Sequence, residues 1–107
     1  MYVSITRTHD PQAQPTELAT IAGEEMLPWF REIDGFEGML MLSSAESGTT
    51  LMLTFWRSEE IAEKHSEARR QFRDSITAAV NVQVVDASGY DLTFAHLGPW
   101  ATEPAGD

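Results

Sequence analysis

The chain has 107 residues, 42% of them hydrophobic and 22% charged, a composition typical of one globular domain. Seventeen acidic against seven basic residues give a formal net charge of −10, which argues against partners such as nucleic acid or an anionic membrane surface. The sequence has no cysteine and shows neither a signal peptide nor a membrane-spanning apolar run, so we expect a cytoplasmic protein without disulfides.

The first half of the chain predicts a strand followed by a bent helix. Apolar and polar residues alternate in YVSITRT (2–8), which predicts a strand, and the proline-containing segment 9–15 predicts a loop. Thr16 is the expected helix cap, and Pro28 removes a backbone donor and should kink the helix near Glu24. The residues that recur at helical spacing are Ala19, Ala22, Met26, Trp29 and Ile33.

A hairpin is predicted next. Gly35 suits the left-handed conformation that ends a helix, and the segments FEGMLMLSS (36–44) and TTLMLTFW (49–56) predict antiparallel strands joined by a turn at 46–48. Neither strand alternates cleanly between apolar and polar residues. Their apolar side chains form two sets on opposite faces: Met39, Met41, Met52 and Trp56 on one, and Leu40, Leu42, Leu51, Leu53 and Phe55 on the other.

The next element is a second helix, capped by Ser58 with two glutamates in its first turn. Counting 100° per residue places His65 on its buried stripe, facing the sheet. The apolar residues of that stripe are Ile61, Ala68, Phe72, Ile76 and Ala79. Arg69, Arg70 and Arg73 lie among acidic residues, which predicts a solvated face of this helix.

The end of the chain predicts two short strands and a tail. Residues 82–85 and 90–97 are strand material, separated by a turn or bulge at 86–89 in which Gly89 supplies an unusual dihedral angle. We expect one domain over residues 1–97 and a flexible acidic tail over 98–107.

The element order βαββαβ predicts an α+β fold of the ferredoxin-like type, a four-stranded antiparallel sheet with two helices on one face. Such a sheet leaves its second face bare, and here that face carries more apolar surface than soluble monomers usually tolerate. The simplest cover is a second copy of the chain, packed sheet against sheet with two-fold symmetry. The sequence therefore predicts a homodimer through the sheet face.

Two segments, PWFREIDGFEGMLML and TFWRSEEIAEKH, resemble the antibiotic biosynthesis monooxygenase-like proteins of the dimeric α+β barrel superfamily. The pattern spans Trp29 to about His65, and weaker similarity extends over residues 2–97. The resemblance implies a barrel formed by two sheets, with a pocket between sheet and helices in each subunit. It also implies oxidation of polyketide-like aromatic substrates by molecular oxygen without metal or flavin, although relatives degrade haem, isomerise or decarboxylate.

Trp56 matches the Trp at the end of the family's third strand, and its large apolar surface suits a flat aromatic ligand. His65 is the candidate general base for deprotonating a phenol, with a structural histidine as the alternative. Arg57 is a candidate clamp for a phenolate or carboxylate, or else a surface residue. The further candidates for contact with a small apolar or aromatic ligand are Met52, Phe72 and Tyr90.

No group of residues has the spacing of a metal site or of a phosphate or dinucleotide motif, so neither a metal nor a cofactor is expected. The first strand has no Asn and the second helix has no Trp–His pair in family register, which disfavours haem degradation. Two functions remain open: a cofactor-independent monooxygenase acting on a small phenolic or quinone-like substrate, and a non-catalytic ligand-binding or structural dimer. A cavity that reaches His65 would favour the first, and a packed helix–sheet interface would favour the second.

Overall fold

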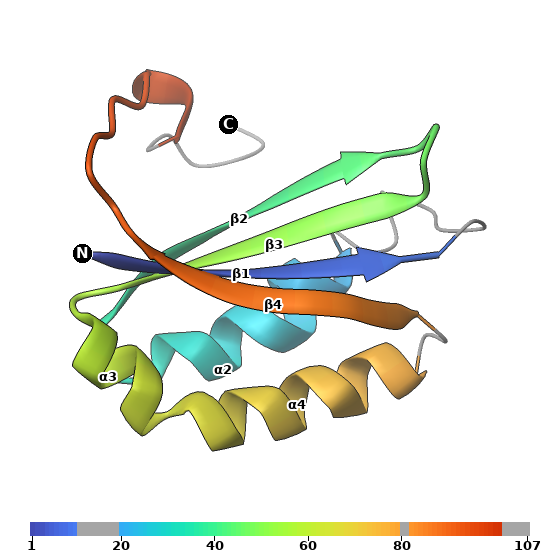
Figure 1. Ribbon diagram of the computed structural model, residues 1–107, viewed down its shortest axis with the longest axis horizontal. Coiled ribbons are helices and arrows are strands. Elements are labelled where there is room, and N and C mark those ends of the chain that lie inside the picture. The colour runs from blue at the N-terminus through green and yellow to red at the C-terminus, as the bar shows by residue number, and fades with distance from the viewer. Residues whose placement is uncertain (11–19, 80–81, 102–107) are drawn as a thin grey trace.

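The computed structural model describes residues 1–10, 20–79 and 82–101, which form one antiparallel sheet covered by helices on one face (Figure 1). The strands lie in the order β2-β3-β1-β4, which together with the helices confirms the predicted ferredoxin-like α+β fold. The strands are β1 (Tyr2–His9), β2 (Phe36–Ser44), β3 (Thr49–Trp56) and β4 (Gln83–Asp91). The helical segments are η1 (Ala22–Met26), α2 (Leu27–Arg31), α3 (Glu59–Lys64), α4 (Ser66–Ala79) and the short turn η2 (Pro99–Ala101).

The first helix is irregular around Glu24, where Pro28 predicts a kink. The segment η1 is a π-helix, and the α-helix α2 follows with Pro28 in its first turn. Pro28 has no N–H, so the carbonyl of Glu24 loses its α-helical donor, and the wider turn lies there. The buried residues of this helix are Ala22, Met26 and Phe30, with Trp29 and Ile33 half-buried. The predicted cap Thr16 and Ala19 lie outside the described residues.

The hairpin has the predicted bounds, and Gly35 before it adopts the predicted left-handed conformation with a φ of 97°.

We expect Gly35→Ala to lower the free energy of unfolding by about 1–3 kcal/mol, because alanine is strained at this φ. Its Cβ would also lie 2.7 Å from the Cγ2 atom of Ile61. Urea denaturation measures the loss. Gly23→Ala is the matched control, since nothing lies within 4 Å of its added Cβ, and an equal loss there would contradict the assignment.

The second helical region is broken at His65, whereas the sequence predicts one continuous helix. Its start is confirmed, because the backbone N–H of Ile61 donates to Ser58 Oγ at 3.2 Å. His65 has φ −105° and ψ 9°, so it ends α3, and α4 begins at the next residue. Of the stripe predicted on α4, Phe72 and Ile76 pack against the core as predicted, but Ala68 is exposed, and Arg69 lies over the ring of Trp56 instead. His65 is a half-buried cap and not a member of a continuous buried stripe.

The last strand is continuous from Gln83 to Asp91, so two separate strands with a turn at 86–89 are wrong, whereas the alternative, a bulge, is found one residue before that range. The irregularity is a one-residue bulge: Arg7 pairs with Asp86 and Thr8 with Val84, which leaves the residue between them unpaired. Gly89 serves a close approach and not a turn, because a Cβ on it would overlap the phenol oxygen of Tyr2. Residues 92–98 have no regular secondary structure.

The two faces of the sheet differ in chemistry. On the central strands, hydroxyl-bearing side chains lie on the helix side: Ser4, Thr6, Thr8, Thr50 and Thr54. Met52 and Trp56 of β3 share this side, whereas most of the other apolar residues of the same strands point the other way, onto a surface we call the outer face. With their neighbours on β2, the outer-face residues are Val3, Ile5, Leu40, Leu42, Leu51, Leu53 and Phe55. The helix-covered core is built around Met26, Phe30 and Trp56.

Candidate functional site

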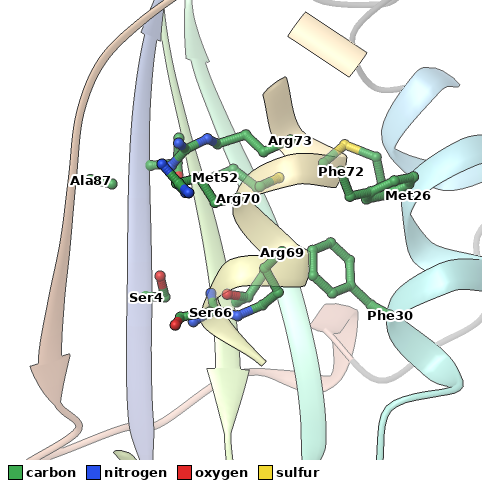
Figure 2. A pocket seen from close by; sticks show the side chains of 12 residues that line it. Ser4, Met26, Phe30, Met52, Ser66, Arg69, Arg70, Phe72, Arg73 and Ala87 are labelled. Atoms are coloured by element: carbon green, nitrogen blue, oxygen red, sulfur yellow. The ribbon is translucent and has the colours of Figure 1, made fainter. Parts of the chain in front are cut away.

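A cavity of about 200 Å³ lies between the helix side of the sheet and α4 (Figure 2). Its floor is polar and comes from the two central strands, through Ser4, Thr6 and Thr54. Its large apolar lining residues are Met26 of η1, Phe30 of α2, Met52 of β3 and Phe72 of α4. A smaller cavity of about 50 Å³ shares part of this lining, including Thr6 and Met52. The site therefore joins hydrogen-bonding groups to an apolar wall, as ligand pockets commonly do.

Three arginines of α4 also line the cavity: Arg69, Arg70 and Arg73. They are three of only seven basic residues in the chain, and among the residues that the structure describes, no aspartate or glutamate lines this cavity. The cavity lining is therefore cationic in a protein whose net charge is −10. The sequence predicts a solvated face for this cluster. That holds for Arg70, whose side chain is 58% exposed, but not for Arg69, which is half-buried, or for Arg73, of which only 19% is exposed.

Arg69 is held by contacts with the core. Its guanidinium carbon lies 4.8 Å from the ring centroid of Trp56, and Nη2 donates to the carbonyl oxygen of Ala62 at 2.8 Å. Its Nε is buried and has no hydrogen-bond partner among the described residues. Burial lowers the pKa of Arg69 below its usual value, while Glu63 and Tyr2 act in the opposite direction. A buried donor without an acceptor costs free energy, which a bound anion would recover.

Arg70 and Arg73 each have an acidic neighbour on the same helix. Arg70 donates to both carboxylate oxygens of Glu67, at 2.6 and 2.7 Å, and these hydrogen bonds hold the pKa of Glu67 below its usual value. Arg73 donates through Nε and Nη2 to Asp74 Oδ1, both at 3.2 Å. Asp74 is 57% exposed, so water competes for this pair and its strength is modest.

The structure brings two of the predicted site residues to the cavity, Met52 and Phe72. Phe72 is fixed by stacking on Trp29, with ring centroids 4.5 Å apart. Trp56 is not among the residues that line the cavity. It lies beneath Arg69, which does line it, and its side chain is fully buried. Its indole Nε1 donates to Thr54 Oγ1 at 2.9 Å, which fixes a cavity-floor hydroxyl. Trp56 therefore supports the site from below.

The other three predicted site residues lie elsewhere. His65, at the junction of α3 and α4, is not among the residues that line the cavity. Arg57 is exposed and pairs with Asp34 at 3.2 Å. Tyr90 is 57% exposed and borders a hollow on the outer face, on the opposite side of the sheet. The three are therefore not assembled around one cavity.

Sequence reasoning missed Arg69 and Arg73 because a continuous helix would turn them away from the sheet. Their spacing of four residues does place them on one helix face. The missing signal was a second helix start. Ser66, directly after His65, is a residue type that commonly begins helices, and a start there brings both arginines over the sheet.

No protein-family model matches the sequence, and a search of curated proteins finds no significant match. Solved structures do match. A monooxygenase from the gene ActVA-Orf6 of Streptomyces coelicolor, in complex with nanaomycin D, has a TM-score of 0.65 at 19% identity, covering 91% of each chain. The chain has the fold of the antibiotic biosynthesis monooxygenases.

Two further structures carry this monooxygenase fold. A putative antibiotic biosynthesis monooxygenase from Deinococcus radiodurans has a TM-score of 0.65 at 17% identity, covering 91% of this chain and 97% of that one. SnoaB from Streptomyces nogalater, a cofactor-independent oxygenase, has a TM-score of 0.64 at 13% identity, covering 88% and 94%. At these identities the likeness concerns the fold.

In residues 1–10, 20–79 and 82–101, no group of three or more acidic or histidine side chains is placed to hold a metal ion. No helix in these ranges is long and apolar enough to cross a membrane.

Proposed function

We propose that the protein is a cofactor-independent monooxygenase that oxidises a small phenolic substrate in the cavity between the sheet and α4. The observation that carries this proposal is the cationic and partly apolar cavity around Arg69, which lies within a monooxygenase fold. SnoaB, which shares this fold, is a cofactor-independent oxygenase, and that supports the reaction class.

The proposed chemistry begins with loss of the phenol proton to solvent. Arg69, whose buried Nε has no acceptor, would stabilise the phenolate and so lower the pKa of the bound hydroxyl. The phenolate makes the ring carbons ortho and para to it electron-rich, and one of them reacts with molecular oxygen. One oxygen atom stays on that carbon as a quinone carbonyl, and the other leaves as water with two hydrogens from the substrate. The substrate supplies all the electrons.

The apolar wall would hold the ring against this group. Phe72 and Met52 provide an aromatic and a thioether contact, both favourable to an aromatic ligand. Because an apolar cavity of about 150 Å³ can hold benzene, a cavity of about 200 Å³ suits one ring with substituents. The adjoining smaller cavity extends the space toward a second ring.

An oxygen electrode tests the proposal, with a dihydroxynaphthalene as substrate and autoxidation without protein subtracted. We expect protein-dependent oxygen uptake matched by formation of the hydroxynaphthoquinone. Arg69→Gln should reduce the rate by about 100-fold, the usual effect of removing one group that stabilises a developing oxyanion. Arg31→Gln, at an exposed arginine of α2, is the matched control and should leave the rate unchanged. Equal rates for Arg69→Gln and wild type would contradict the proposal.

His65→Ala separates this assignment from the general-base role that the sequence suggests for His65. His65 does not line the cavity, so we expect the variant to retain the wild-type rate. A rate lost in His65→Ala but kept in Arg69→Gln would make His65 the base and Arg69 a structural residue.

A non-catalytic ligand-binding protein is the second candidate. It is favoured by one observation: among the described residues, no carboxylate or imidazole lines the cavity to act as a general base. Ligand binding without oxygen uptake from any phenol would establish this alternative.

We also propose that the protein is a homodimer joined through the outer face. Leu42 is 52% exposed on this face, and five further apolar outer-face residues of the three strands are only half-buried within a single chain. A symmetric sheet-to-sheet contact would cover this surface and leave the helices, and with them the cavity, on the outside.

A further inference from the structure

The cationic groups of the cavity lie at two positions, not one. In Figure 2, Arg69 lies toward Ser4 and Ser66, whereas Arg70 and Arg73 lie toward Ala87. Arg69 and Arg73 are four residues apart on α4, which separates their backbones by roughly 6 Å along the helix. Facing them on β1, Ser4 and Thr6 are two residues apart, roughly 6.6 Å along the strand. Helix and strand therefore present two polar positions with matching spacing.

Each position has free hydrogen-bonding capacity. At the first, the hydroxyls of Ser4 and Ser66 and the Nε of Arg69 form no hydrogen bond within the described part of the chain. At the second, the same holds for the Thr6 hydroxyl, and Arg73 keeps its Nη1 unpaired while Asp74 occupies its other two nitrogens. Because Asp74 is largely exposed, a carboxylate held inside the cavity could compete with it for the guanidinium.

The cavity that contains both positions also has an apolar lining, to which Phe72 and Met52 contribute. A ligand that reaches both polar positions and fills this cavity would therefore carry an apolar body between two polar groups. A benzene ring with substituents in para positions separates them by about the same distance as the arginines, whereas ortho substituents lie side by side and reach only one position.

We propose that the ligand of this cavity is a para-hydroxylated aromatic carboxylate. Its phenol oxygen lies at Arg69 and Ser4, and its carboxylate lies at Arg73 and Thr6. This inference deepens the proposed function by naming the substrate class, and it rests on the same cavity. With the para position blocked, the ring carbon ortho to the hydroxyl is the one open to oxygen.

Calorimetric titration with three probes tests the inference on the wild-type protein, so that no folding defect of a variant can obscure it. The probes are para-hydroxybenzoate, its ortho isomer, and para-hydroxybenzamide, a neutral analogue of the same shape. We expect the para acid to bind at least tenfold more tightly than either of the others. Equal affinity for the acid and the amide, or tighter binding of the ortho isomer, would overturn the inference.

Two variants test which residue binds the carboxylate of the ligand and which binds its phenol oxygen. Arg73→Gln should remove the preference for the acid over the amide, and Arg31→Gln should preserve it. Arg69→Gln should remove the ultraviolet signal of bound phenolate that we expect for the wild-type complex near neutral pH. A preference that survives in Arg73→Gln, or a phenolate signal that survives in Arg69→Gln, would contradict the assignment of that end.

The binding experiment is independent of the oxygenase proposal. Tight and selective binding of para-hydroxybenzoate without oxygen uptake from any phenol would leave this inference standing and remove the oxygenase. Oxygen uptake with a dihydroxynaphthalene, but no preference among the three probes, would remove this inference and leave the oxygenase.

Discussion

Replacing Trp56 with alanine is expected to lower the free energy of unfolding by about 3–5 kcal/mol, the range for deleting a large buried aromatic side chain. Trp56 is the largest fully buried side chain among the described residues, and it contacts Phe30 and Phe36 edge to face. Since a domain of this size is stable by only about 5–15 kcal/mol, the variant should lie close to global unfolding at room temperature. Urea denaturation followed by circular dichroism, at one fixed protein concentration, measures the change.

Trp56→Phe is the graded control. It keeps most of the buried ring but leaves Thr54 Oγ1 without the indole donor, so we expect a loss of about 1–2 kcal/mol. The same variant weakens the stacking of Arg69 and should reduce oxygen uptake without unfolding the protein. A loss below 1 kcal/mol in Trp56→Ala would show that the core does not depend on this residue.

The sequence predicts the hairpin with correct bounds because its signals are local. A glycine with positive φ precedes the hairpin, and Gly48, with φ 67°, ends its turn. The fold class follows from the order of elements, which short connections restrict to few arrangements. The cap at Ser58 is equally local, since one side chain and one backbone N–H three residues later define it.

The candidate site could not be predicted in the same way, because it depends on the phase of α4. After the interruption at His65, Arg69 takes the inward place predicted for Ala68, while Phe72 and Ile76 stay packed against the core as predicted. Two predictions from the sequence, for His65 and for Arg69, are therefore reversed. His65 does not line the cavity, and Arg69, predicted to be solvated, does.

The polarity of the central strands connects the site to the proposed dimer. In β1 and β3, Ser4, Thr6 and Thr54 turn toward the helices, which provides a polar floor for the cavity. Because side chains alternate along a strand, the same register sends Ile5, Leu53 and Phe55 to the outer face. A hydrophilic cavity floor and an apolar outer face are therefore two consequences of one register, and exchanging the faces would abolish both.

Leu53→Glu is expected to convert the proposed dimer into a monomer. Leu53 lies on β3 in register with Ile5 and Leu40, at the middle of the apolar outer face. In a two-fold contact the substitution occurs twice, so two carboxylates would be buried without partners. We expect the dissociation constant to rise at least about 1000-fold, equivalent to about 4 kcal/mol. Sedimentation velocity at micromolar concentration should show twice the 11.9 kDa chain mass for wild type and a single chain mass for the variant.

Ala68→Glu is the matched control for this substitution, because it adds the same side chain at an exposed position of α4, away from the outer face. It should sediment as a dimer. A monomeric wild-type protein, or a Leu53→Glu variant that associates as strongly as wild type, would remove the sheet-to-sheet dimer.

The cavity lies wholly within one chain, between its own sheet and α4, so monomeric Leu53→Glu should still bind the aromatic probe with wild-type affinity. Loss of binding together with dimerisation would instead show that the two faces of the sheet are coupled through the register of β1 and β3.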